Sequence, residues 1–213
     1  MRSACAFAQQ NNIPLQRDIY IDVERNAVRD TTPVHDGLKP LIQSRADTTN
    51  VMGYRVDKGR YYYWLTEKIF KEHLLMVNDK DFRLNVDPVF NLEIGQDRGD
   101  RTAYADTNRY IVNSRGVMIA GDIGKKLSFQ TVFYETQALV PKYLLSYSYE
   151  TGVIAGQART KYKSNNVTLD YAWSQGNVSY SPTTWLNIQF GHGKHFVGHG
   201  YRSMLLSDNA IVS

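Results

Sequence analysis

The chain has 213 residues, of which 42% are hydrophobic and 22% charged, a composition typical of a folded protein and not of a disordered one. Its net charge is only +4, and the one basic–aromatic cluster, Arg159-Thr-Lys161-Tyr-Lys163, is too small to predict a nucleic-acid partner. Tyrosine is frequent, at 15 residues, and it is typical of β-strands, sugar-binding surfaces and the water–lipid boundary of membrane proteins.

Residues 1–10 resemble the end of a secretory signal peptide, because Ala6-Phe7-Ala8 has the small residues of a cleavage site. The apolar stretch that should precede such a site is missing, so we interpret residues 1–10 as a signal-peptide remnant, with a merely Ala-rich tip as the alternative. Cys5 is the only cysteine and would leave with the signal, so no disulfide is expected.

Residues 11–79 are expected to form a small helical segment. The stretch Leu15 to Val28 predicts one short helix. Tyr61 to Val77 predicts a second, because its apolar side chains recur every three or four residues. The polar run Asn78-Asp79-Lys80-Asp81 would end this second helix.

From residue 80 to residue 213 the period changes from 3.6 to 2, which predicts β-strands. Between Phe82 and Ile94 the even-numbered positions carry no charge, and the odd-numbered positions are mostly polar. No run of about 18 apolar residues exists, which excludes a transmembrane helix. Alternating strands of this kind are typical of transmembrane barrels, although a half-buried soluble strand has the same pattern.

Further strands follow in quick succession, without helices between them, so an antiparallel meander is favoured over a parallel βαβ fold. They are predicted at Val117–Ile123 and Leu127–Phe133 around a turn at Gly124-Lys125-Lys126, at Tyr143–Tyr149, at 154–162, at 167–180 with a bulge near Gly176, and at Trp185–His192. The predicted fold class is mainly β: a partial antiparallel transmembrane β-barrel preceded by a small α-helical segment. A soluble antiparallel β protein is the alternative.

The end of the chain carries the most specific motif, a glycine- and histidine-rich run followed by Ser203 and two leucines. It resembles the signature of the capsule assembly protein Wzi family, in which Phe-(Trp)-Gly-x-Gly leads to Ser-Leu-x-Leu-Ser-Asn-Asn-Ala, and it is most similar to the gliding-motility-associated variant. Val197 and His199 depart from the tryptophan and proline of many members. The matching residues are Phe196, Gly198, Gly200, Ser203, Leu205, Leu206, Ser207, Asn209 and Ala210.

The resemblance implies an outer-membrane β-barrel of a Gram-negative bacterium, with periplasmic helices in residues 11–79 and barrel strands in residues 80–213. Family barrels have more strands than this chain can supply, so we expect an N-terminal fragment. The family is lectin-like, which implies capsular or other surface polysaccharide and outer-membrane lipid as partners, no cofactor and no catalysis. A gliding-motility or adhesion component that binds envelope proteins is one alternative, and a soluble carbohydrate-active β protein is another.

Inward-facing polar side chains are the candidate polysaccharide-binding residues, because they can hydrogen-bond hydroxyls or pair with acidic sugars while tyrosines stack on the rings. A solvated polar surface is the alternative for each of them. For the 196–210 run, a structural role in fixing a loop or a barrel rim is expected. The candidate binding residues are Arg83, Glu93, Arg159, Lys161, Asn187 and Gln189.

Other chemistry is not favoured. The spacing of His192, His195 and His199 would suit a metal site on a helix, but the neighbouring glycines oppose a helix. The aspartates at 97, 100 and 106 lack the spacing of a calcium loop. No serine lies in a nucleophile-elbow context, so no enzyme and no metal are predicted.

Overall fold

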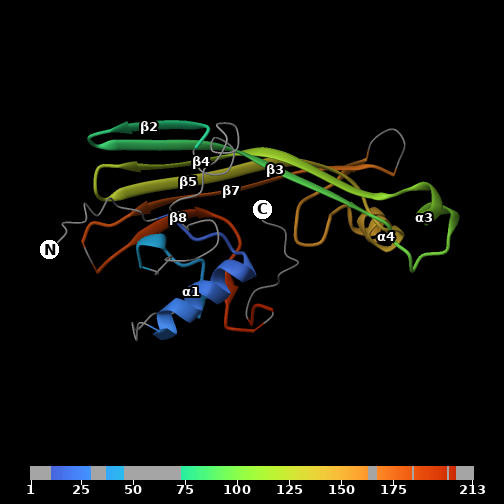
Figure 1. Cartoon of the computed structure of the whole chain (residues 1–213), viewed down its shortest axis with the longest axis horizontal. Coiled ribbons are helices and arrows are strands. Elements are labelled where there is room, and N and C mark those ends of the chain that lie inside the picture. Colours follow the sequence, from blue (N-terminus) through green and yellow to red (C-terminus); the bar gives the residue numbers. More distant parts are fainter. Residues whose placement is uncertain are drawn as a thin grey trace, which may run out of the picture. The chain divides into compact units, whose positions relative to one another are not determined.

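The computed structural model describes residues 11–29, 37–45, 73–162, 167–183, 185–200 and 202–204 (Figure 1). The signal-peptide remnant, residues 61–72 of the second expected helix and the signature residues from Leu205 to Ala210 lie outside the described residues. Two compact units make up the chain. Unit 1 combines Met1–Asp87, Ile119–Gln130 and Gly176–Asp208, and unit 2 combines Pro88–Met118, Thr131–Gln175 and Asn209–Ser213.

The described part of the chain is mainly β. Its larger sheet has seven strands in the order β2-β3-β4-β5-β7-β6, with β8 also paired to β7. The β2–β3, β6–β7 and β7–β8 ladders of this sheet are antiparallel, which confirms the antiparallel prediction. Within the described ranges the sheet is open, with β2 at one edge. The strands are β2 (Leu75–Asp79), β3 (Phe82–Gly95), β4 (Tyr110–Ile123), β5 (Leu127–Leu139), β6 (Lys161–Tyr162), β7 (Leu169–Tyr180) and β8 (Ile188–His192).

Four strands of this sheet are long. β3, β4, β5 and β7 have 14, 14, 13 and 12 residues, whereas strands of globular proteins most often have about five or six. Short and long connections alternate along them. Residues 80–81 join β2 to β3 and residues 124–126 join β4 to β5, but residues 96–109 join β3 to β4 and residues 140–168 join β5 to β7.

Unit 1 contains the N-terminal helix α1 (Arg17–Arg29), which confirms the helix predicted from Leu15 to Val28. Its buried face, Ile19, Tyr20 and Val23, packs with the fully buried Ile13. The Tyr20 hydroxyl donates to Ile13 O and accepts from Leu41 N, so it connects α1 to the residues before it and to the segment around Leu41. That segment holds β1 (Leu38–Lys39), which pairs with β9 (Phe196–Val197), and the short helix η1 (Gln43–Arg45).

Unit 2 has its own core beneath the helix α4 (Lys142–Thr151), which covers the ends of β5 and β7. Leu145 of the helix packs with side chains from both strands, and Tyr104 of the one-and-a-half-turn helix α3 (Ala103–Thr107) packs against the same cluster. The buried members of the core are Ala138, Val140, Leu145, Ala158, Leu169 and Tyr171.

The helix α4 corrects the prediction of a strand at Tyr143–Tyr149. Pro141 is the N-cap residue, and Gly152 ends the helix in the left-handed conformation, with φ 72° and a hydrogen bond from Gly152 N to Ser148 O. Proline before a helix and glycine after it are ordinary helix boundary signals. The apolar positions of the segment therefore follow the helical period, with Leu145 and Ser148 buried on one side.

The strand predicted at 154–162 is also wrong, except for its last two residues. Gly156 has φ 72°, and Ile154 N donates to Ala158 O, so the chain turns there instead of continuing as a strand. Only the isolated bridge between Val153 and Arg159 and the two-residue β6 remain of it.

Two further predictions need correction. Residues 75–79, expected to be the end of a helix or its cap, form β2, because the polar run that follows makes a hairpin turn onto β3. The covered face of β7 is the same at both ends of the strand, because Leu169, Tyr171 and Ser179, all at odd positions, are buried, and Val178 and Tyr180, at even positions, are exposed. The covered side of β7 carries apolar side chains in unit 2 and polar side chains in unit 1. In the sequence, the apolar residues therefore move from odd to even positions without a bulge.

Among the described residues, no helix has the length and apolar character that a membrane crossing requires.

Candidate functional site

A shallow depression of about 480 Å³ lies in unit 2, between the connection from β3 to β4 and the start of α4. One side supplies two carboxylates, and the other supplies an ammonium group, a hydroxyl and an aromatic ring. This mixture of hydrogen-bonding groups and an exposed ring is typical of carbohydrate-binding surfaces. The lining residues are Asp97, Gly99, Asp100, Lys142, Tyr143 and Ser146.

The carboxylates of the depression hold their own loop in place. Asp97 accepts hydrogen bonds from the N–H groups of Gly99 and Asp100, at 3.0 and 3.3 Å, which makes an Asx turn. Asp100 accepts a hydrogen bond from Thr102 N at 2.9 Å, and this bond lowers the pKa of Asp100 below its ordinary value. Asp100 is therefore an ionised acceptor at neutral pH.

Tyr104 ties this loop to the segment that enters α4. Its hydroxyl donates to Val140 O at 2.7 Å, across 36 residues of sequence. Burial raises the pKa of Tyr104, so the phenol stays protonated and the hydrogen bond is kept at neutral pH. The loop and the helix start thus form one structure within unit 2.

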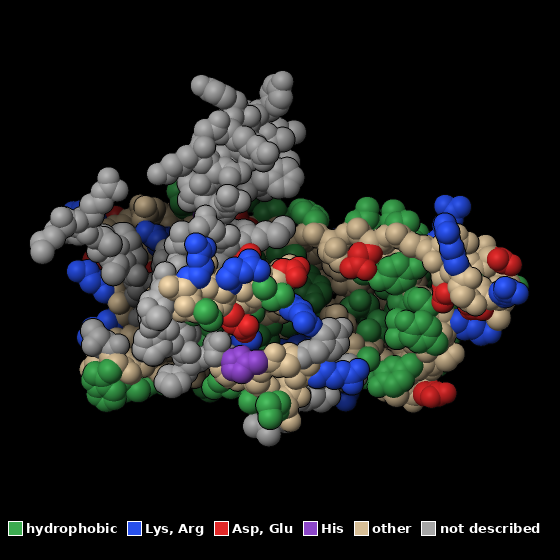
Figure 2. Space-filling model, turned by 60° about the horizontal axis from the view of Figure 1, so that its bottom comes forward, with side chains coloured by type: hydrophobic (Ala, Val, Ile, Leu, Met, Phe, Trp, Pro, Cys, Tyr) green, Lys and Arg blue, Asp and Glu red, His purple; other side chains and the backbone are tan. Residues whose placement is uncertain are grey.

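The outer side of α4 presents tyrosines to solvent. Tyr143 and Tyr147 are 67% and 43% exposed and lie one helical turn apart, so they share a face. Figure 2 shows hydrophobic side chains, tyrosine included, gathered over the part of unit 2 that carries α4, with acidic and basic side chains around them. We name Tyr143, Tyr147 and Lys142 the α4 tyrosine surface.

A second pair of tyrosines fixes the end of the helix. The rings of Tyr149 and Tyr162 stack at 4.6 Å with 8° between their planes, and Tyr162 Oη donates to Ser148 Oγ at 3.3 Å. Ser148 is fully buried and donates to Leu145 O. These contacts hold β6 against α4 and fix the position of the helix that carries the α4 tyrosine surface.

The six predicted binding residues do not gather in one place. Arg83, Asn187 and Gln189 belong to unit 1, and Glu93, Arg159 and Lys161 belong to unit 2. Glu93 accepts hydrogen bonds from Tyr110 Oη at 2.7 Å and from Asn91 Nδ2 at 2.9 Å. Arg159 and Lys161 are both exposed. Arg159 forms an isolated bridge with Val153 after α4, and Lys161 of β6 pairs with Asp170 of β7.

Asn187 and Gln189 meet around a buried serine of β7. Ser179, which is fully buried, accepts from Asn187 Nδ2 at 3.1 Å and from Gln189 Nε2 at 2.9 Å. Gln189 also donates to Asn12 Oδ1 at 3.0 Å, and Asn187 donates to Ser181 Oγ at 2.9 Å. These two residues therefore connect β8, β7 and the N-terminal segment.

The described signature residues have structural contacts. Phe196 pairs with Lys39 in the β1–β9 ladder, Gly198 N donates to Gly37 O at 2.7 Å, and Val197 N donates to Ser203 Oγ at 3.0 Å. Gly200 lies just beyond, and it is exposed. The described residues of the run thus contact residues 37–39.

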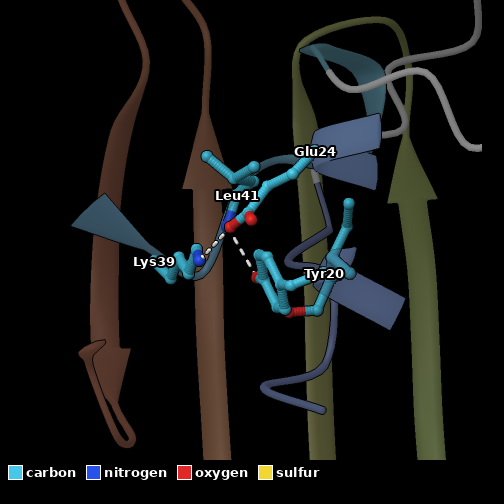
Figure 3. Close-up of polar contacts among 5 residues, drawn as sticks. Tyr20, Glu24, Lys39 and Leu41 are labelled. Atoms are coloured by element: carbon cyan, nitrogen blue, oxygen red, sulfur yellow. Dashed lines mark hydrogen bonds and ion pairs between the residues drawn. The ribbon is translucent and has the colours of Figure 1, made fainter. Parts of the chain in front are cut away.

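The same contact region contains an ion pair between Lys39 and Glu24 of α1 (Figure 3). The Lys39 side chain is only 8% exposed and lies 4.9 Å from the Tyr20 ring centre and 5.6 Å from the Phe196 ring centre. Burial of a lysine is compensated here by a carboxylate and two aromatic faces. Lys39 is therefore a packing residue of unit 1.

In the described ranges, no three of the histidines, cysteines, aspartates or glutamates come together as they would in a metal site. His192 ends β8, and His195 precedes β9. The ring of His199 lies beside Gly37.

Sequence reasoning missed the α4 tyrosine surface, because it assigned this segment to a strand. Pro141 and Gly152, eleven residues apart, were the signals that would have predicted the helix. Comparison of the chain with family models, with curated proteins and with solved structures gave no match in any of the three.

Proposed function

We propose that the chain is a non-catalytic outer-membrane protein of the capsule assembly class, which binds surface polysaccharide through the α4 tyrosine surface. Its long strands would cross the outer membrane of a Gram-negative bacterium as part of a β-barrel. The proposal depends above all on one observation: parts of β3, β7 and β8 expose apolar side chains at alternate positions, and polar side chains between them are hydrogen-bonded.

In unit 2 this arrangement is seen along β3. Phe90, Leu92 and Ile94 are 76%, 65% and 68% exposed. Asn91 and Glu93, which point to the opposite face, bond to one another and to Tyr110. A soluble antiparallel sheet turns its apolar side chains to the core and its polar ones to water. Asn91 and Glu93 are exposed too, so β3 has no buried face here, and its exposed apolar positions favour a strand that faces lipid.

Unit 1 has the same arrangement on β7 and β8. Val178, Tyr180, Ile188 and Phe190 are 45%, 43%, 53% and 85% exposed, while Ser179, which lies between two of them, is fully buried. Exposed apolar side chains of this size in neighbouring strands form a patch that soluble monomers avoid. Lipid is the partner that suits a patch made of alternate strand positions.

Strand length and connectivity support the same proposal. A membrane-spanning strand needs about 9–11 residues, and β3, β4, β5 and β7 all exceed this length. Outer-membrane barrels alternate short periplasmic turns with longer extracellular loops. Residues 80–81 and 124–126 would be the periplasmic turns, and residues 96–109 and 140–168 would be the extracellular connections.

The α4 tyrosine surface lies in one of these long connections, where a surface polysaccharide would meet it. Tyrosine rings stack on the apolar faces of sugars, Lys142 can bond to hydroxyls or to acidic substituents, and Asp97 and Asp100 can accept hydrogen bonds from hydroxyls. Binding without turnover is supported by the carboxylates, because both accept hydrogen bonds from their own loop. They therefore act as loop-forming groups.

Fractionation combined with polysaccharide binding tests this proposal. We expect the chain, expressed with its natural flanking sequence, to remain in outer-membrane pellets after carbonate extraction and to bind purified capsular polysaccharide. Release into the soluble fraction would contradict the membrane assignment. Deletion of the gene should reduce capsule retention; loss of surface spreading with normal capsule would favour the gliding-motility alternative.

A further inference from the structure

Three side-chain amides on the sheet strands of unit 1 contain buried atoms that have no hydrogen-bond partner within the described part of the chain. They are Asn85 Oδ1 on β3, Gln130 Oε1 on β5 and Asn177 Nδ2 on β7. Folded proteins satisfy nearly all of their buried polar atoms, because an unmade bond costs more than a made one contributes. Three such atoms on three strands of one sheet therefore require a physical reason.

Two of the amides are direct neighbours across the sheet. The bond from Ser181 N to Lys126 O sets the register of β7 against β5, and four residues along each strand it brings Asn177 opposite Gln130. On the other side of β7, Asn177 pairs with Gly191 of β8.

The row continues toward β3. The Ser128–Asp122 hydrogen bond aligns β5 with β4 and places Ala120 opposite Gln130. The bond from Gly124 N to Asp81 O aligns β4 with β3 and places Asn85 opposite Ala120. The complete row, which we name the amide row, is Asn85, Ala120, Gln130, Asn177 and Gly191.

The residues that flank the amides have no hydrogen-bonding side chain. Ala120 and Gly191 offer only a methyl group and a hydrogen atom, and a Cβ on Gly191 would overlap the backbone of Gly176. One row further along the sheet, by contrast, Asp122 bonds to Ser128, and Ser179 bonds to Gln189. On the described sheet strands of unit 1, unsatisfied amides are thus confined to one row, and the next row pairs its polar groups.

The row presents two acceptors and one donor and carries no charge. Hydroxyl groups both donate and accept, so neighbouring hydroxyls of a sugar complement such a set, whereas a carboxylate would meet the two acceptor oxygens unfavourably. We propose that the amide row is a second binding site, for a neutral, hydroxyl-rich oligosaccharide segment. It goes beyond the α4 tyrosine surface, because it uses other residues and specifies an uncharged ligand.

Isothermal titration of the full chain in detergent tests the proposal, with maltoheptaose, cellohexaose and a dextran oligomer as neutral probes and trigalacturonate as the acidic probe. The variants Asn85→Leu, Gln130→Met and Asn177→Leu keep side-chain size and remove the amide. We expect at least one neutral probe to bind, and each variant to weaken that binding by roughly two- to tenfold. Absence of binding by all three neutral probes, or equal binding by the variants, would overturn the proposal.

Thermal unfolding of the free protein distinguishes a loss of binding from a loss of folding. Since each variant removes an unsatisfied group, we expect its melting temperature to stay the same or rise, whereas Ser179→Ala, which breaks satisfied bonds, should lower it. If either asparagine variant does not fold, Gln130→Met alone decides. Loss of neutral-sugar binding in Tyr143→Ala but not in the amide variants would overturn the amide row and leave the α4 tyrosine surface in place.

Discussion

Lys39 and Phe196 are directly opposite one another in the β1–β9 ladder, and the Lys39 ammonium lies 5.6 Å from the centre of the Phe196 ring. The same ammonium pairs with Glu24 of α1. Three segments that are far apart in the sequence therefore meet at one side chain. The phenylalanine of the C-terminal motif holds the N-terminal segment of unit 1, which gives the motif a physical role that does not involve ligand.

Replacing Lys39 by methionine should destabilise unit 1. The change keeps the packing of the aliphatic chain but leaves Glu24 without its cation, and Glu24 is 31% exposed, so water recovers part of the loss. We expect a loss of about 2 kcal/mol, below the ~3–5 kcal/mol of a fully buried pair. Denaturant unfolding in detergent measures it. Arg25→Met is the matched control, because the Arg25–Asp22 pair is exposed and should contribute less than about 0.5 kcal/mol.

Gly198→Ala should destabilise the loop that joins β9 to Ser203. Gly198 has φ 108°, which side-chain-bearing residues rarely adopt, and a Cβ there would lie 2.9 Å from Met204 Sδ. We expect a loss of roughly 1–3 kcal/mol and faster proteolysis of this loop. Gly124→Ala is the control, since a Cβ at Gly124 meets nothing within 4 Å and only its φ of 60° is unfavourable. Equal effects of the two changes would contradict the steric argument.

Period alone predicted the parts of the fold whose burial is simple. Helix α1 has one buried face, so local pattern and tertiary burial agree there. The alternation of β3 lies in its sequence, and its side chains are half-buried or exposed along the whole strand. The hairpin at Gly124 was found because glycine can adopt the positive φ that this turn has.

The wrong predictions concern segments whose sequence pattern is compatible with two different structures. The run at 143–149 alternates tyrosine with small or apolar residues, which resembles a strand until Pro141 and Gly152 are taken into account. In β7 the apolar side changes from Leu169 and Tyr171 to Val178 and Tyr180, because α4 covers one part of the strand only. The amide row also lay outside sequence reasoning, since it depends on the register of four strand pairs.

Leu92→Lys should impair membrane insertion, whereas Asn91→Lys should not. Leu92 is 65% exposed on the apolar face of β3, and Asn91 bonds to Glu93 on the opposite face. A lysine that faces lipid costs about 2–4 kcal/mol at mid-bilayer. Yield of carbonate-resistant protein in outer-membrane pellets measures the effect. Equal yields for the two variants would count against a lipid-facing β3.

Stability of unit 2 should fall as pH rises above about 10, the ordinary pKa of tyrosine. Burial raises the pKa of Tyr104 in the folded protein. In that range the unfolded chain loses the proton while the folded chain keeps it, so ionisation favours unfolding, and no such effect exists at lower pH. Unfolding curves from pH 8 to 11 measure it. In Tyr104→Phe, which also loses the bond to Val140 O, this part of the pH dependence should disappear.

Tyr143→Ala should weaken polysaccharide binding without unfolding the protein. Tyr143 is 67% exposed, so its removal leaves the α4 core of Leu145 and Ser148 intact. An exposed aromatic side chain contributes to sugar-binding free energy mainly through stacking of its ring. We therefore expect affinity to fall by roughly fivefold to tenfold, measured by titration with capsular polysaccharide. Tyr143→Phe keeps the ring and should bind nearly as well. Loss of binding in Tyr143→Phe equal to that in Tyr143→Ala would show that the hydroxyl acts instead of the ring, and unchanged binding in both would remove α4 from the polysaccharide site.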